Sequence, residues 1–138
     1  NELVNFIKKQ NFNFYGVVER SKLPYQEYLE TIYNSSINLA LEGKGEFTFR
    51  HLEILASCSF MICQSSINQL ELPLPLINGK HFVSFDNKND LLEKINFYLK
   101  NTELRNEIAI NGRRVLEENY SPKMHGKFLF NQIFKKIN

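Results

Sequence analysis

Short apolar runs alternate with longer amphipathic stretches through most of the chain. The runs are rich in β-branched and aromatic residues, and they occupy 12–18, 37–41, 60–63 and 81–85. In the stretches between them, apolar residues recur every three or four positions, which is the period of a helix. Alternation of this kind predicts βαβ units, and therefore an α/β domain with a Rossmann-like parallel sheet of four strands flanked by helices.

Six helices are expected around this sheet. The stripe of the second helix, which follows Pro24, is the clearest, with apolar positions at i, i+3, i+4, i+7 and i+8. Its members are Tyr25, Tyr28, Leu29, Ile32 and Tyr33. We interpret these tyrosines as core residues. The first helix is expected at 2–9 and the third at about 48–57, and two or three of the remaining helices stack at the C-terminal end.

Polar residues predict where the last three helices begin. Asp90, with Glu93 three residues further on, has the pattern of a capping box. Thr102 is expected to cap the next helix. Ser121 followed by Pro122 combines a capping side chain with a proline at the first helical position, so it is the strongest helix start in the chain.

The ligand of an open parallel sheet lies beyond the carboxyl ends of its strands. In this chain the loops at that edge are 16–20, 42–46, 64–68 and 85–88. Only the second of these loops carries a strong chemical signature. It contains Gly43-Lys44-Gly45 and leads into a helix that bears Arg50 and Glu53.

Each part of this segment suits one part of a nucleotide. Glycines let the backbone approach a ligand, and a helix start offers unpaired N–H donors to a phosphate. Lys44 and Arg50 can neutralise a diphosphate, and Glu53, one turn beyond Arg50, can accept two hydroxyl protons from a ribose diol. From spacing alone, a surface turn followed by an Arg–Glu pair is the simpler interpretation, because a GxG motif without a third glycine is a weak signal.

Composition excludes several other classes of protein. With 138 residues, 43% of them apolar, the chain suits one folded domain. A net charge of +2 from dispersed basic residues does not favour nucleic acid as a partner. Cys58 and Cys63 lack metal-ligand spacing, and the apolar runs are far shorter than the ~20 residues of a membrane span. We therefore expect free thiols, no bound metal and a cytoplasmic location.

The helix after the glycine loop also carries a resemblance to a known family. Residues 49–58 (Phe-Arg-His-Leu-Glu-Ile-Leu-Ala-Ser-Cys) resemble the Arg-x-Phe-Glu-x-x-Ala-x-Gly element of glycosyltransferases with the GT-B fold, most closely that of the CgeB-like group. The likeness continues in order through 81–85, 89–95, 97–99, 103–109 and 112–114. It spans residues 25–135 as a whole.

A second group with the same fold, the protein O-glucosyltransferase and capsule-associated family, is also similar. It has a Gly-x-Gly loop, a nearby Arg, a Ser after the helix and a Leu-x-Pro segment followed by His-Tyr-Val. The residues that resemble these features are Gly43, Gly45, Arg50, Ser57, Leu74, Pro75 and 81–83. The choice between the two groups stays open, and both imply the same biochemistry.

The resemblance implies that the chain is the C-terminal, donor-binding half of a two-domain glycosyltransferase. Glu53 would bind the ribose of a nucleotide-diphosphate sugar and Arg50 its diphosphate. Gly43 to Gly45 would lie near the sugar, and Gly16 to Glu19 beside the base. A nucleotide sugar would then be the substrate, and no metal or other cofactor is required, because amides, a helix end and cationic side chains can meet the charge of the leaving group.

Three departures from the family pattern qualify this expectation. Cys58 stands where the CgeB-like group usually has glycine. Glu46 precedes Glu53 by seven positions rather than the eight of the paired-glutamate motif. The strands that normally open such a domain are missing ahead of Asn1. We therefore expect 1–138 to be one nucleotide-sugar-binding domain from a larger enzyme, inactive on its own, whose catalytic base lies elsewhere and stays unassigned.

The expected reaction is transfer of a sugar to a saccharide, lipid-linked or protein acceptor, as in polysaccharide or glycoconjugate biosynthesis. A sugar-nucleotide epimerase of the same fold and a non-catalytic interaction module stay open as alternatives. Arg113-Arg114 and Lys135-Lys136 are interpreted as solvated helix faces, although an enzyme with a lipid-linked acceptor would also use them in peripheral contact with a membrane. His51, next to Arg50, is expected to be satisfied or to face solvent.

Overall fold

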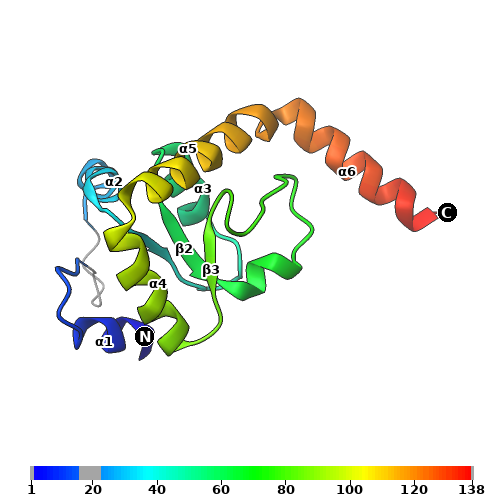
Figure 1. Cartoon of the computed structure of the whole chain (residues 1–138). Coiled ribbons are helices and arrows are strands. Elements are labelled where there is room, and N and C mark those ends of the chain that lie inside the picture. The colour runs from blue at the N-terminus through cyan, green and yellow to red at the C-terminus, as the bar shows by residue number, and fades with distance from the viewer. Residues whose placement is uncertain (1, 16–22, 138) are drawn as a thin grey trace.

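A parallel sheet forms the centre of the molecule. The computed structural model describes residues 2–15 and 23–137 (Figure 1). Its strands are β1 (Asn38–Ala40), β2 (Met61–Gln64) and β3 (Val83–Phe85), in the order β1-β2-β3. Leu39 lies beside Ile62, and Ile62 lies beside Val83. The described part is therefore an open α/β, Rossmann-like sheet with helices around it.

The helices agree with the expected stretches to within about two residues at most of their ends. They are α1 (Glu2–Lys8), α2 (Tyr25–Asn34), α3 (Phe49–Ala56), α4 (Lys88–Lys100), α5 (Thr102–Asn119) and α6 (Pro122–Ile137), with a short 3₁₀ helix, η1 (Ser65–Gln69), after β2. Residues 12–15 of the first expected strand have no strand structure, and 16–18 lie outside the described residues. None of the helices in the described part is long and apolar enough to cross a membrane.

The sheet buries both of its faces. In β2 the side chains of Met61 and Cys63 join one hydrophobic cluster, and Ile62 between them joins another. The first cluster is completed by α2, α3 and α5, and the second by α1, α4 and the start of α5. A central parallel strand is covered on both sides and therefore has a continuous apolar sequence, as β2 does.

Two of the expected helix caps are wrong. The side chain of Asn87, not Asp90, caps α4 by accepting hydrogen bonds from the amides of Asn89 and Asp90. Thr102 is the first helical residue of α5 rather than its cap. Ser121 does cap α6, because its hydroxyl oxygen accepts a hydrogen bond of 3.2 Å from the amide of Met124.

Helix α5 packs closely on its neighbours at Gly112. A Cβ atom added there would lie 2.7 Å from the carbonyl oxygen of His81 and 2.7 Å from Cδ2 of Leu55 in α3. Both distances are shorter than real carbon contacts, so only glycine lets α5 take this position. Gly112 thereby fixes α5 against α3, the helix that carries Arg50 and Glu53.

Several residues of the predicted apolar stripes are exposed. Tyr25 and Tyr33 on α2 are 62% and 74% exposed, so the interpretation of these tyrosines as core residues is wrong. Large apolar side chains on the last two helices are also exposed: Leu104 on α5, and Leu129, Ile133 and Phe134 on α6. Helix α6 extends away from the sheet and its helices in Figure 1, so its apolar side chains have no covering layer within the described part of the chain.

Candidate functional site

The first turn of α3 is anchored by a buried histidine. The amide of Thr48 donates a hydrogen bond of 3.1 Å to Nδ1 of His51, whose ring lies 5.0 Å from that of Phe47. Because Nδ1 accepts this bond, the neutral ring carries its proton on Nε2. Nε2 is buried and has no hydrogen-bond partner among the described residues. Burial lowers the pKa of His51, and the charge of Arg50 also lowers it.

The histidine therefore does not face solvent, and it is only partly satisfied. Its Nδ1 has a hydrogen-bond partner, whereas its Nε2 has none among the described residues. It turns inward at the third helical position, and Arg50 before it is exposed. One turn later, Glu53 is half-buried. The two residues singled out by the sequence thus lie on the outer side of a helix whose start is fixed from within.

Glu53 is engaged by two tyrosines of α2. Tyr28 donates a hydrogen bond of 2.8 Å to Oε2 of the carboxylate, and Tyr25 donates one of 3.2 Å to Oε1. No ion pair joins Arg50 to Glu53 within the described residues. The simple Arg–Glu surface pair is therefore not what forms here.

The carboxylate of Glu53 contributes to a raised pKa in both phenols. The hydrogen bond to Glu53 raises the pKa of Tyr25, because a negative charge beside the hydroxyl disfavours its ionisation. The pKa of Tyr28 is also raised, first by burial and then by the bond to Glu53, against the lowering effect of the Arg50 charge. Both tyrosines are therefore protonated donors at neutral pH.

Arg50 contacts the ring of Tyr28, the same tyrosine whose hydroxyl is bonded to Glu53. The guanidinium lies 5.8 Å from the centroid of the Tyr28 ring, within reach of a cation–π interaction. Arg50 and Tyr28 line a cavity of about 670 Å³, to which α1, residues 11–15, β1 and α4 also contribute walls. Apolar members of this lining include Ile7, Ile32, Leu39, Ile54 and Ile95. Glu53 is not among the described residues that line it.

The glycine loop between β1 and α3 is open. A Cβ atom at Gly43 or Gly45 would meet nothing within 4 Å, and neither residue has a left-handed backbone conformation. The fold itself therefore does not demand glycine at either position, and the space beside the backbone is free for a ligand. Lys44 between them is exposed, and no hydrogen bond or ion pair among the described residues joins it to Arg50 or Glu53.

A polar cleft of about 740 Å³ opens beyond the carboxyl ends of the strands. Three of the four loops expected at this edge meet there, and the described residues that line it include Glu42, 64–66 and 85–89. The side-chain oxygen of Gln64 accepts a hydrogen bond of 2.6 Å from the amide of Glu42, whose carboxylate accepts one from the hydroxyl of Ser66. These bonds join the end of β1 to the end of β2.

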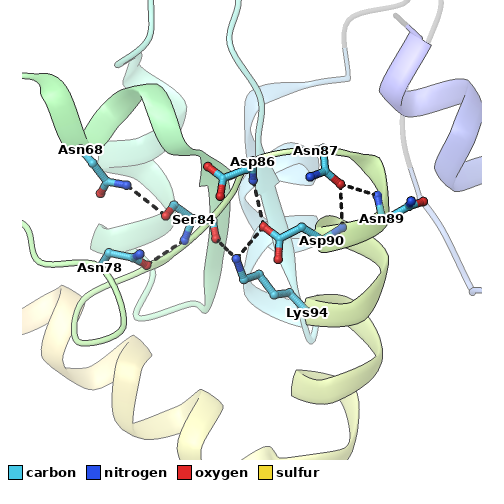
Figure 2. A network of polar contacts seen from close by, with 8 residues as sticks. All are labelled: Asn68, Asn78, Ser84, Asp86, Asn87, Asn89, Asp90 and Lys94. Atoms are coloured by element: carbon cyan, nitrogen blue, oxygen red, sulfur yellow. Dashed lines mark hydrogen bonds and ion pairs between the residues drawn. The ribbon is translucent and has the colours of Figure 1, made fainter.

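A hydrogen-bond network fixes the third side of this cleft (Figure 2). The ammonium of Lys94 donates 2.6 Å to the carbonyl oxygen of Ser84 and lies 2.7 Å from the carboxylate of Asp90. The amide of Asp86 donates to the same carboxylate, and the bond from Lys94 keeps the pKa of Asp90 low. Ser84 is held from the other side by Asn68 and Asn78. The turn from β3 into α4 is therefore set before any ligand arrives.

The remaining predicted residues, Gly16 and Glu19, lie outside the described residues, so their place beside a base stays a prediction. Sequence reasoning missed Tyr25 and Tyr28 as partners of Glu53. The signal available was two hydroxyl-bearing rings three positions apart on one helix, which the apolar periodicity assigned to the core. Within the described part of the chain, no three His, Cys, Asp or Glu side chains gather as a metal site requires.

The open parallel sheet, flanked by helices and with a polar cleft at its carboxyl edge, defines an α/β, Rossmann-like protein. Residues 1–129 match the model of a family described as glycosyl transferase-like, and the chain belongs to this family. Neither the curated proteins nor the solved structures gave a significant match. Glycosyl transfer is the general activity of this family, with a sugar donor and an acceptor as partners.

Proposed function

We propose that this chain is the donor-binding part of a cytoplasmic glycosyltransferase with the GT-B fold, of the CgeB-like or the protein O-glucosyltransferase type, which uses a nucleotide-diphosphate sugar. The observation that supports this most is the placement of Arg50 and Glu53. They lie on the outer side of one helical turn, directly after an open glycine loop, and Tyr28 contacts both. A cation and a hydroxyl acceptor at this spacing suit a diphosphate and its ribose.

The electrostatics of the site support an anionic ligand beside a diol. Arg50 is exposed and has no carboxylate partner among the described ion pairs, so its fork of donors is available to phosphate oxygens. A carboxylate offers about four acceptor positions, of which the two phenols use two. Glu53 is therefore not saturated and can still accept a ribose hydroxyl.

The polar cleft supports a place for the sugar that is transferred. It begins at Glu42, one residue before the glycine loop that would carry the diphosphate. Its hydroxyl, amide and carboxylate groups match the hydroxyls of a sugar ring in chemistry. A saccharide, lipid-linked or protein acceptor would approach from the same edge, and backbone amides with Arg50 and Lys44 would stabilise the leaving diphosphate.

Calorimetric titration with a panel of nucleoside diphosphates (UDP, GDP, ADP and dTDP) tests this proposal. We expect one of them to bind and the Arg50→Ala variant to bind it ~10- to 100-fold more weakly, as for loss of a charge-assisted bidentate contact. The matched control is Arg114→Ala, because Arg114 is exposed on α5. Binding by Arg50→Ala at the wild-type affinity, or no binding of any nucleotide, would contradict the proposal.

A further inference from the structure

The two phenols that contact Glu53 are unequal. Tyr28 is half-buried, makes the shorter hydrogen bond of 2.8 Å, and also has its ring beneath Arg50. Tyr25 is 62% exposed and makes the longer bond of 3.2 Å. Their rings lie 6.2 Å apart, so the two hydroxyls approach the carboxylate from neighbouring positions on α2.

This inequality decides which bond a ligand can replace. A pair of neighbouring ribose hydroxyls binds a carboxylate best when each oxygen accepts one of them. Oε1 and Oε2 already hold one phenol each, and that of Tyr25 is the one accessible to solvent. Exchanging the Tyr25 bond for a ligand hydroxyl leaves every polar group satisfied, because the exposed phenol can bond to water instead.

Tyr28 cannot be exchanged in the same way. Its hydroxyl orients Glu53 while its ring lies against the guanidinium of Arg50, so one side chain sets the relative position of the two candidate ligand contacts. Tyr28 is also less exposed than Tyr25, so water replaces the bond of its hydroxyl less readily.

We infer that Tyr28 is a positioning residue for Glu53 and Arg50, and that Tyr25 is an exchangeable partner whose phenol leaves Glu53 when the diol of a nucleotide binds. This inference rests on the proposed function, because it takes the ligand to be a nucleoside diphosphate. It predicts effects of opposite sign for the same Tyr→Phe substitution at two positions on one helix.

The test measures the affinity of the full chain for the nucleoside diphosphate that wild type binds best, and for the 2′,3′-dideoxy form of that nucleotide. Tyr28→Phe should weaken binding of the ribonucleotide about tenfold, whereas Tyr25→Phe should strengthen it about threefold, each change corresponding to one hydrogen bond. Neither substitution should change binding of the dideoxy nucleotide by a comparable factor. Tyr33→Phe, an exposed tyrosine on the same helix, is the matched control.

The outcomes separate this inference from the proposed function. If wild type prefers the ribonucleotide over the dideoxy form but both tyrosine variants weaken binding equally, the inference is wrong and the donor site stands. If Tyr28→Phe weakens both nucleotides equally, Tyr28 has a structural role only, and the inference is wrong. If wild type binds no nucleoside diphosphate, both are overturned. Circular dichroism and thermal unfolding establish that each variant is folded.

Discussion

The packing of α5 at Gly112 gives a prediction in which one substitution has different effects at two glycines. Alanine at Gly112 would place its Cβ 2.7 Å from the carbonyl oxygen of His81 and from Cδ2 of Leu55. Alanine at Gly126 in α6 would meet nothing within 4 Å. Both glycines lie inside helices, so the gain in helix propensity is the same in the two cases.

The magnitudes follow from the contacts. Overpacking costs about 1–3 kcal/mol, and the upper part of that range applies at Gly112 because the carbonyl of His81 belongs to the backbone and cannot rotate away. Helix propensity returns about 1 kcal/mol. We expect a net loss of about 2 kcal/mol in the free energy of unfolding for Gly112→Ala. For Gly126→Ala we expect no loss, and a gain of up to about 1 kcal/mol.

Urea unfolding followed by circular dichroism measures both variants. With an m-value of about 2 kcal/mol/M, Gly112→Ala should lower the midpoint by about 1 M at unchanged m. The same variant should weaken nucleotide binding if α5 fixes the position of α3 through Leu55. Equal midpoints for the two alanine variants would refute the reasoning, because helix propensity alone would then explain both.

Two further predictions concern titration. His51 and His81 both have a pKa lowered from 6.5, chiefly by burial, so the unfolded chain binds more protons as the pH falls. The stability that their neutral rings contribute is complete above pH 6.5 and is lost as the pH falls through the folded pKa. The melting temperature should therefore decrease as the pH is lowered below 6.5, and a constant value there would contradict this. In the second, Glu53→Gln should lower the pKa of the Tyr25 phenol, because the charged acceptor that raises it is gone. Ultraviolet titration measures the pKa of the phenol, and Glu30→Gln, on α2 with Tyr25, is the control. An unchanged pKa in Glu53→Gln would show that the hydrogen bond from Tyr25 to Glu53 is absent in solution.

The sequence predicts the elements of this fold better than their environment. Periods of two and of about 3.6 are set by local backbone geometry, so strands and helices follow from them. The same period states which face of α2 is apolar but not whether another layer covers it, which is why Tyr25 is exposed. Asn87 and Asp90 are both good capping residues; in the structure Asn87 caps α4, while Asp90, three positions further on, accepts a local hydrogen bond from the amide of Asp86.

The candidate site divides in the same way. Arg50 and Glu53 lie on one turn because three positions separate them in a helix, and this is visible in the sequence. The bond from Tyr28 to Glu53 joins residues 25 positions apart, and it exists only because α2 packs beside α3. No local pattern predicts such a bond. The roles of Gly43, Lys44 and Gly45 remain predictions for the same reason, since their contacts depend on a ligand.

The network around Lys94 has a consequence for the entropy of binding. It immobilises the turn from β3 into α4 in advance, so a molecule that enters the cleft finds that wall already ordered. Glu42 at the start of the glycine loop is bonded to Gln64 and Ser66, but no side-chain hydrogen bond among the described residues holds 43–45, and glycine loses the most conformational freedom when it is fixed. The ordering cost of association therefore falls on the glycine side, and substitutions that stiffen this loop in its bound form should slow release of the ligand.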